Sequence, residues 1–125
     1  GSLVLTPNKK IYAAGDMVEI TVSGKGLHYV NGLSFALPYS TDEFEYVGTE
    51  LINMKDMVNL TYDRLHTNGQ KELFPTFVNR GNNFLLDEGD NNLFVIKFKA
   101  KKAGKFNLKA KDGMLVDRNL GTVKF

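Results

Sequence analysis

The chain of 125 residues contains no cysteine and no tryptophan, and each absence narrows the functions open to it. Without cysteine there is no disulfide framework, no thiolate metal site and no cysteine nucleophile. Carbohydrate-binding modules often stack sugar rings on exposed tryptophan, so the absence of tryptophan weakens that class of function. A domain of this length buries roughly two-thirds of its unfolded surface, so it needs no disulfide or metal in order to fold.

Long apolar runs and a strong net charge are also missing. No run approaches the roughly 20 apolar residues that cross a membrane. The net charge of +2 is too small to imply a polyanionic partner. Seven lysines lie between Lys97 and Lys111, but they mostly alternate with apolar residues, and no exposed aromatics that could stack bases are interleaved with them. This pattern favours the solvated face of two strands, so we expect no membrane span and no nucleic-acid partner.

Residues with catalytic chemistry are few. His28 and His66 are the only histidines; both lie in polar turns, and no nucleophile elbow accompanies them. Acidic residues cluster at 42–45 and 87–90, where carboxylates usually accept hydrogen bonds from turn backbone. The run LLDEGDNN could bind calcium through Asp87 and Asp90, but it lacks the acidic order of an EF-hand loop. We therefore expect no enzyme activity and no metal or other cofactor in this chain.

What the sequence does have is an alternation of apolar and polar residues with period two, broken by Gly, Asn and Asp. In MVEITVSG, residues 17–24, Val18, Ile20 and Val22 share one face. Asn68-Gly69 suits the tight turn of a hairpin. We count about nine short strands at spacings of about 10–14 residues and no convincing helix, which predicts an all-β sandwich of jelly-roll or immunoglobulin-like topology.

The sandwich is expected to form one domain over residues 3–125, with Gly1-Ser2 as an expression scar. Its predicted core consists of the apolar members of the alternating strands: Val18, Ile20, Val22, Leu33, Phe35, Leu37, Tyr39, Phe77, Phe94, Ile96, Phe98, Phe106, Leu108 and Val123.

One strand is unusual on its solvent side. In VNGLSFALPYS, residues 30–40, the apolar face alternates with Ser34, Ala36 and Pro38, where a solvated strand would normally carry Lys, Glu or Thr. This outward face is therefore small, uncharged and flat.

The order of features resembles the cohesin family over nearly the whole chain. The residues that carry the resemblance are a Gly-Asp turn before MVEITVSG, the strand NGLSFALPYS ending at Tyr39, the segment FEYVG, and LFVIKFKAKKAGKFNLKAKDGML. Ser40 stands where many cohesins have Asp, and 51–92 matches poorly. The sequence is therefore most similar to the divergent cohesin-like modules of large secreted glycoside hydrolases of clostridial type.

The resemblance implies a nine-stranded jelly-roll sandwich without catalytic activity. Cohesins bind a dockerin, a small helical calcium-binding module of another protein, on a flat sheet of the third, fifth, sixth and eighth strands. Calcium is then expected in the dockerin and not in this chain. We further expect a module that is secreted or at the cell surface within a multimodular protein, is monomeric when unbound, and tethers carbohydrate-active enzymes to one another.

Carried over residue by residue, the resemblance implies a partner-binding face. Its members come from the four strands and an adjoining edge: Ser34, Ala36, Pro38, Leu60, Tyr62, Phe74, Thr76, Val78, Asn79, Arg80, Met114 and Leu120. Pro75 leaves an alternative open, because a shifted register would turn Leu73 and Phe77 outward instead. A carbohydrate-binding sandwich with a platform of Tyr29, Tyr46 or Tyr62 is the alternative function, and a structural spacer is a third.

Overall fold

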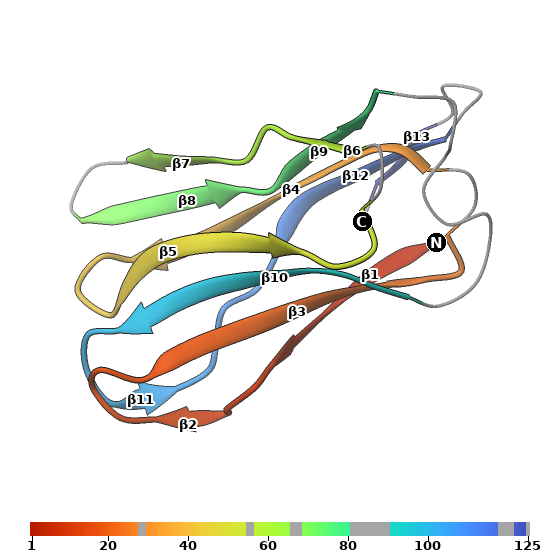
Figure 1. The fold of residues 1–125 in the computed structure, drawn as a ribbon. Coiled ribbons are helices and arrows are strands. Elements are labelled where there is room, and N and C mark those ends of the chain that lie inside the picture. The colour runs from red at the N-terminus through yellow and green to blue at the C-terminus, as the bar shows by residue number, and fades with distance from the viewer. Residues whose placement is uncertain (28–29, 55–56, 66–68, 81–90, 118–121, 125) are drawn as a thin grey trace.

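The computed structural model describes residues 1–27, 30–54, 57–65, 69–80, 91–117 and 122–124, with only the backbone for Asp117 and for 122–124. Within these ranges there are thirteen strand segments and no helix. The predicted all-β class is confirmed. Two antiparallel sheets pack face to face as the layers of a sandwich (Figure 1).

The first sheet has the strand order β1-β3-β10-β5. Its strands are β1 (Ser2–Pro7), β3 (Met17–Lys25), β10 (Asn91–Ala100) and β5 (Phe44–Leu51). Alternation along β3 buries Val18, Ile20 and Val22, as the sequence predicts. The two-residue strands β2 (Ile11–Tyr12) and β11 (Gly104–Lys105) pair with each other as a separate small ribbon.

The second sheet has the order β13-β12-β4-β8-β7, with β9 beside β4 and β6 beside β9. Its strands are β13 (Thr122–Lys124), β12 (Lys111–Asp117), β4 (Val30–Ser40), β8 (Gln70–Phe74), β9 (Thr76–Asn79), β7 (Tyr62–Leu65) and β6 (Met57–Asn59). The long central strand β4 positions everything on this sheet, because β12 and β8–β9 pair with its two edges.

Several of these segments are parts of one strand. β8 pairs with β4 through Leu37 and Leu73, and β9 continues the same register through Ser34 and Thr76. The interruption is Pro75, which has no backbone N–H to contribute to a ladder. β6 and β7 likewise keep one register against β9 and β8. With each pair counted as one strand, and β2 and β11 set aside, nine strands remain in the described part of the chain, as predicted.

The core between the sheets is aromatic. Phe94 packs against Phe77 and Phe35 at ring-centroid distances of 4.7 and 6.3 Å, and Phe98 packs against Tyr39 at 4.8 Å. These rings join β10 of the first sheet to β4 and β9 of the second. All predicted core residues with described side chains are buried except Phe106 and Leu108, and Val123 lies outside the described side chains.

The stretch after β11 corrects one sequence prediction. Residues 106–110 alternate like a strand but do not form one beyond Phe106, whose N–H donates to the Lys10 carbonyl and extends the β2–β11 pairing. Phe106 and Leu108 are only half-buried against the core. Alternation alone cannot tell a strand from an irregular segment that dips inward at every second residue. The hairpin between β7 and β8 is confirmed by their pairing, and Gly69 has a φ of 71°, which glycine adopts without strain. Asn68 lies outside the described residues.

Candidate docking face

The outward side of β12, β4, β8–β9 and β6–β7 forms one continuous surface, called here the β4 face. Leu73 and Phe77 are buried in the core, whereas Val78 is exposed and Phe74 and Thr76 are half-buried. Pro75 therefore leaves the register unshifted, and the predicted parity of this strand is confirmed. Its last outward member, Arg80, is exposed.

Register places the outward side chains in four rows that run across the strands. The first row is Val116, Gly32, Val78 and Val58; the second is Met114, Ser34, Thr76 and Leu60; the third is Lys111, Ala36, Phe74 and Tyr62; the fourth is Pro38, Glu72 and Arg64. The first three rows taken together are mostly apolar, and the charges collect in the third and fourth. The predicted members from β4, β6–β7 and β8–β9, apart from Asn79, therefore share one face.

Four large apolar side chains of this face are open to solvent. Val78 is 43% exposed, Leu60 52%, Tyr62 53% and Met114 38%. The rings of Tyr62 and Phe74 are stacked with centroids 4.8 Å apart and an interplanar angle of 16°. A contiguous apolar patch on a monomer usually marks a surface that binds something.

Ala36 corrects the sequence prediction of an open floor along β4. Its side chain is only 1% exposed. Lys111 and Glu72 stand on the two strands that flank β4, and their ion pair of 3.0 Å between Nζ and Oε1 crosses over it. The small residues of β4 at this end thus make room for an intramolecular bridge. Ser34 and Pro38 are half-buried and remain at the surface.

The bridge depends on an irregularity in β12. The register against β4 shifts by one residue between Lys111 and Met114, and Asp112 there has a φ of 53°. Without this bulge Lys111 would pair with Leu37 and share its inward direction. The extra residue pairs Lys111 with Ala36 instead, so its ammonium reaches Glu72 on the outer face. A hydrogen bond from Lys111 to Glu72 and the negative charge of Glu72 raise the pKa of the ammonium above its usual value.

One other predicted residue, Asn79, does not belong to the β4 face as expected. Asn79 has the parity of Phe77, so it lies on the core side of β9 and is half-buried. Leu120 lies outside the described residues. Met114 sits within β12, opposite Ser34, rather than beyond the end of a strand.

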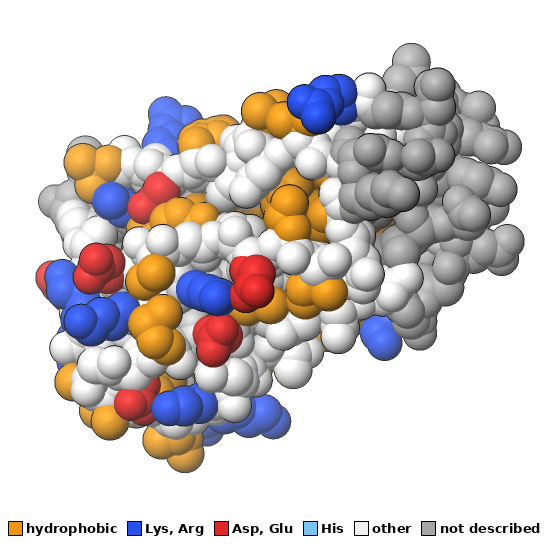
Figure 2. Space-filling view, viewed as in Figure 1, with side chains coloured by type: hydrophobic (Ala, Val, Ile, Leu, Met, Phe, Trp, Pro, Cys, Tyr) orange, Lys and Arg blue, Asp and Glu red, His pale blue; other side chains and the backbone are white. Residues whose placement is uncertain are grey.

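The opposite outer surface, that of the first sheet, has a different chemistry. Lys97 lies between two glutamates, with Nζ 2.9 Å from Glu50 Oε2 and 3.9 Å from Glu19 Oε1. Figure 2 shows basic and acidic side chains interspersed over β3, β5 and β10. This is the ordinary surface of a solvated sheet, and the lysines of β10 belong to it, as the sequence analysis favoured.

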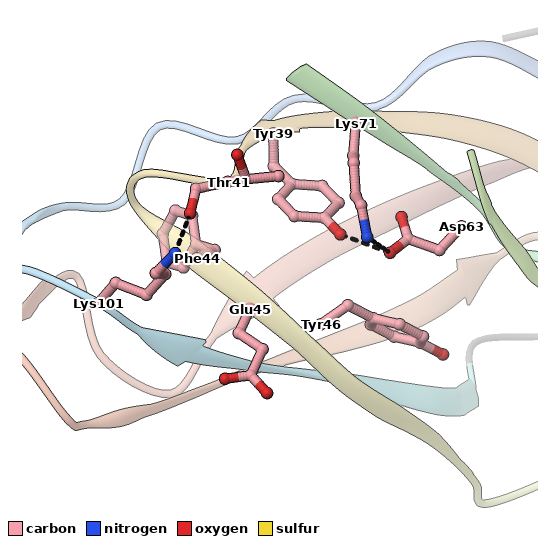
Figure 3. A pocket seen from close by; sticks show the side chains of 8 residues that line it. All are labelled: Tyr39, Thr41, Phe44, Glu45, Tyr46, Asp63, Lys71 and Lys101. Carbon is pink, nitrogen blue, oxygen red and sulfur yellow. Dashed lines mark hydrogen bonds and ion pairs between the residues drawn. The ribbon is translucent and has the colours of Figure 1, made fainter. Parts of the chain in front are cut away.

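A cavity of about 250 Å³ opens at the edge of the sandwich between the two sheets (Figure 3). Tyr39, Asp63 and Lys71 line it from the second sheet, and Phe44 and Tyr46 from β5. The Tyr39 hydroxyl donates a hydrogen bond of 2.6 Å to Asp63 Oδ2, and Lys71 Nζ lies 3.2 Å from the same oxygen. Burial first, and then Asp63, raise the pKa of Tyr39. These polar groups mainly bind one another, and their contacts connect β7 to β4 and β8.

Sequence reasoning missed both the Tyr39–Asp63–Lys71 cluster and the Lys111–Glu72 bridge. The first joins residues up to 32 positions apart and has no local signal. The second had one, because Asp112-Gly113 is a dipeptide typical of turns and bulges.

Two kinds of feature are absent from the described residues, namely a metal-binding cluster and a membrane-spanning helix. No group of three or more His, Asp or Glu residues there could hold a metal ion. The calcium candidate at Asp87 and Asp90, and both histidines, lie outside these residues. Nor does any helix capable of crossing a membrane occur in the described ranges.

Solved structures with the same architecture are cohesin modules. A cohesin module from a family 33 glycoside hydrolase of Clostridium perfringens superposes with a TM-score of 0.66 at 14% identity, over 98% of this chain and 91% of that chain. The second type II cohesin of an adaptor scaffoldin of Acetivibrio cellulolyticus gives a TM-score of 0.71 at 10% identity, over 97% and 81%. This chain has the cohesin fold.

A third cohesin-fold neighbour was solved as a type I cohesin–dockerin complex from Clostridium thermocellum. Its TM-score is 0.66 at 12% identity, and the match covers 98% of this chain and 92% of that chain. No protein-family model and no curated protein sequence matches this chain. At these identities the similarity establishes the cohesin fold, and with it the predicted jelly-roll sandwich.

Proposed function

We propose that this cohesin-fold chain is a non-catalytic interaction module that binds a dockerin on the β4 face. The observation that carries the proposal is the contrast between its two outer surfaces. The first sheet exposes Val4, Met17 and Val47, but among charged side chains such as those paired around Lys97. The second sheet exposes Val78, Leu60, Tyr62 and Met114 on one face, and the register puts small or apolar residues between them.

The dimensions of the β4 face suit a helix. Neighbouring strands are about 4.8 Å apart, so four strands give a surface about 14 Å wide. Successive rows are about 7 Å apart, so the first three rows extend for about 14 Å along the strands. A helix with its side chains is about 10–12 Å in diameter. The patch therefore accommodates one helix of about two to three turns at its centre.

The exposed apolar residues are the expected anchors of the complex. In protein interfaces a few well-packed aromatic and aliphatic side chains contribute most of the binding energy, and a polar rim surrounds them. Tyr62 is held by its stack against Phe74, so it loses little conformational entropy on binding. Ser34 and Thr76 between the anchors are small and offer hydroxyl groups to a partner.

The test is calorimetric titration with recombinant dockerin modules from the genome that encodes this chain, in calcium and again in chelator. We expect one-to-one binding in calcium and none in chelator, because the proposal places the metal in the dockerin. Val78→Asp should weaken binding by at least about tenfold, because it buries a charge at an apolar contact.

The chain offers a closely matched control. Val4 on β1 is 41% exposed, compared with 43% for Val78, but it lies on the outer surface of the other sheet. Val4→Asp should bind as the unaltered protein does. Equal losses in the two variants, or no heat with any dockerin, would refute the proposed face or the proposed function.

The wider setting is proposed on the resemblance to cohesins of secreted systems. The similar module from Clostridium perfringens belongs to a glycoside hydrolase. We infer that this chain is a module of a secreted or cell-surface protein that tethers carbohydrate-active enzymes, and that it is monomeric until a dockerin binds. Co-purification of a dockerin-bearing protein from culture supernatant tests this setting.

The carbohydrate-binding alternative finds no support in the tyrosines that the structure describes. Tyr62 stacks on Phe74, so one of its ring faces is covered. Tyr46 packs edge-on against Phe98, and its hydroxyl lies 2.6 Å from Thr49 Oγ1. Tyr29 lies outside the described residues.

A further inference from the structure

The β4 face is chemically polarised along its strands. Its first two rows carry Val78, Leu60 and Met114, and its last two carry Lys111, Glu72 and Arg64. The apolar end is open, whereas Ala36 at the other end is sealed beneath the Lys111–Glu72 bridge. A partner that covers the whole face must therefore change from aliphatic to polar along its length.

The charged end presents mainly cations. The Lys111 side chain is 55% exposed and that of Glu72 only 15%, so the bridge leaves more of its lysine than of its glutamate open to solvent, and Asp112 adds a negative charge near Lys111. Arg64 is exposed in the same row as Glu72. Beside them a shallow recess of about 280 Å³ is lined by Pro38, Gln70, Lys71, Glu72 and Lys111.

We propose, resting on the proposed function, that the charged end selects its partner. The dockerin that docks here presents a helix lying along the strands, with an aliphatic stripe over Val78 and Leu60. An acidic side chain of that helix, about two turns from the stripe, lies over Arg64 and Lys111. Arg64 and Lys111 are thus specificity-determining residues of the β4 face.

Partner side chains other than acidic ones would bind less favourably at the charged end. An aliphatic side chain there would remove water from the Lys111–Glu72 bridge and give nothing in return, and removing water from an ion pair is costly. A basic side chain would meet two cations. A carboxylate instead accepts the planar pair of N–H donors of a guanidinium and approaches the exposed ammonium of Lys111.

The spacing within the helix follows from the spacing of the rows. The second and fourth rows are two row steps apart, or about 14 Å along the strands. At a rise of 1.5 Å per residue, about nine helical residues cover this distance. An acidic side chain about seven to nine positions from an aliphatic anchor therefore reaches the charged end.

Charge variants test this with the same calcium-loaded dockerin modules as probes. Arg64→Glu should weaken binding by about tenfold or more at low salt, with most of the change in the association rate. Lys99→Glu on the exposed surface of β10 makes the same reversal on the opposite sheet and should change the affinity less than about twofold. The affinity of the unaltered protein should fall as salt is raised, and Arg64→Glu should remove much of that dependence.

A variant with the opposite expected sign makes the test stricter. Glu72→Gln removes the only acidic side chain of the four rows and frees Lys111, so an acidic helix should bind a few-fold more tightly. Weaker binding by Glu72→Gln would overturn the inference, because it would mean that the partner places a cation here. Arg64 and Lys111 are exposed, so their variants are expected to keep the native fold, and circular dichroism and thermal melting verify this.

The possible outcomes separate the two proposals. If the unaltered protein binds no dockerin, the proposed function fails and this inference falls with it. If it binds and Val78→Asp prevents binding, but Arg64→Glu and added salt have no effect, the docking face stands and its selective charged end does not.

Discussion

Tyr39 makes the stability of the fold sensitive to alkaline pH in a way that can be measured. The side chain is 3% exposed, and its hydroxyl donates to Asp63 Oδ2 at 2.6 Å. Burial first, and the hydrogen bond and charge of Asp63 next, raise the pKa of Tyr39 above the ordinary tyrosine value of about 10. The unfolded chain therefore releases this proton near pH 10, while the folded protein retains it.

The sign follows from proton linkage. Above about pH 10 the folded state holds one more proton than the unfolded state, so its stability is complete below that pH and falls as the pH rises. The loss from one tyrosine approaches about 1.4 kcal/mol per pH unit and amounts to about 1.4 kcal/mol by about pH 11. Tyr12, whose pKa is raised by burial and by Glu43, adds a loss of the same sign.

Tyr39→Phe isolates the contribution of this hydroxyl. At about pH 8 the variant should be less stable by about 2 kcal/mol, since it removes a buried hydrogen bond to a charged group. It has no phenol to ionise, so the gap to the unaltered protein should shrink to about 0.6 kcal/mol by about pH 11. Urea unfolding followed by far-ultraviolet circular dichroism gives both free energies of unfolding.

The refuting result is a difference in free energy of unfolding, between Tyr39→Phe and the unaltered protein, that stays constant or widens as the pH rises. It would mean that Tyr39 ionises as readily in the folded protein as in the unfolded chain, and hence that the hydroxyl is not buried against Asp63. Tyr62→Phe is the matched control at about pH 8. The Tyr62 side chain is 53% exposed, so its hydroxyl should contribute less than about 0.5 kcal/mol.

Three further substitutions probe the parts that build the β4 face and the core. Asp112→Val should destabilise by about 1–2 kcal/mol, because a β-branched residue is strained at φ 53°, whereas Asp112→Gly should not; equal melting temperatures would contradict this. Gly24→Ala should cost about 1–3 kcal/mol in urea unfolding, because its new Cβ would clash with the buried Leu27 side chain; unchanged stability would show that Leu27 moves freely. Phe98→Ala should cost about 3–5 kcal/mol, since the ring is buried among three others, and a loss below about 1 kcal/mol would rule out that packing.

The alternating strands were predictable because burial on one side of a sheet imposes a period of two on the sequence. This fixed the inward residues of β3, β4 and β10, and it placed Val78 outside and Phe77 inside even though Pro75 lies between the two segments. The outward position of Leu60 and Tyr62 was predictable only from the resemblance to cohesins, because β6 and β7 are short and irregular.

Features that depend on a single irregularity or on distant partners were not predictable. The bulge at Asp112 turns Lys111 outward, and only the folded sheet shows that Glu72 stands across β4 to meet it. Because that bridge could not be foreseen, Ala36 was expected at an open surface. The need for a small residue at this position was predicted correctly. The irregular stretch at 106–110 has the apolar–polar alternation of a strand, because every second side chain packs partly against the core.

The inward carboxylate of Asp63 also has a consequence for solubility. β7 is an edge strand of its sheet, and free edges invite a strand from another copy to join them and begin aggregation. An added strand at β7 would remove more water from Asp63, whose side chain is 19% exposed and whose Oδ1 is already buried without a hydrogen-bond partner. The ladder beside it is already irregular, because the Thr76 N–H donates to Thr61 Oγ1 in place of a backbone carbonyl. A protein with an exposed apolar sheet face is thereby discouraged from growing edge to edge with itself.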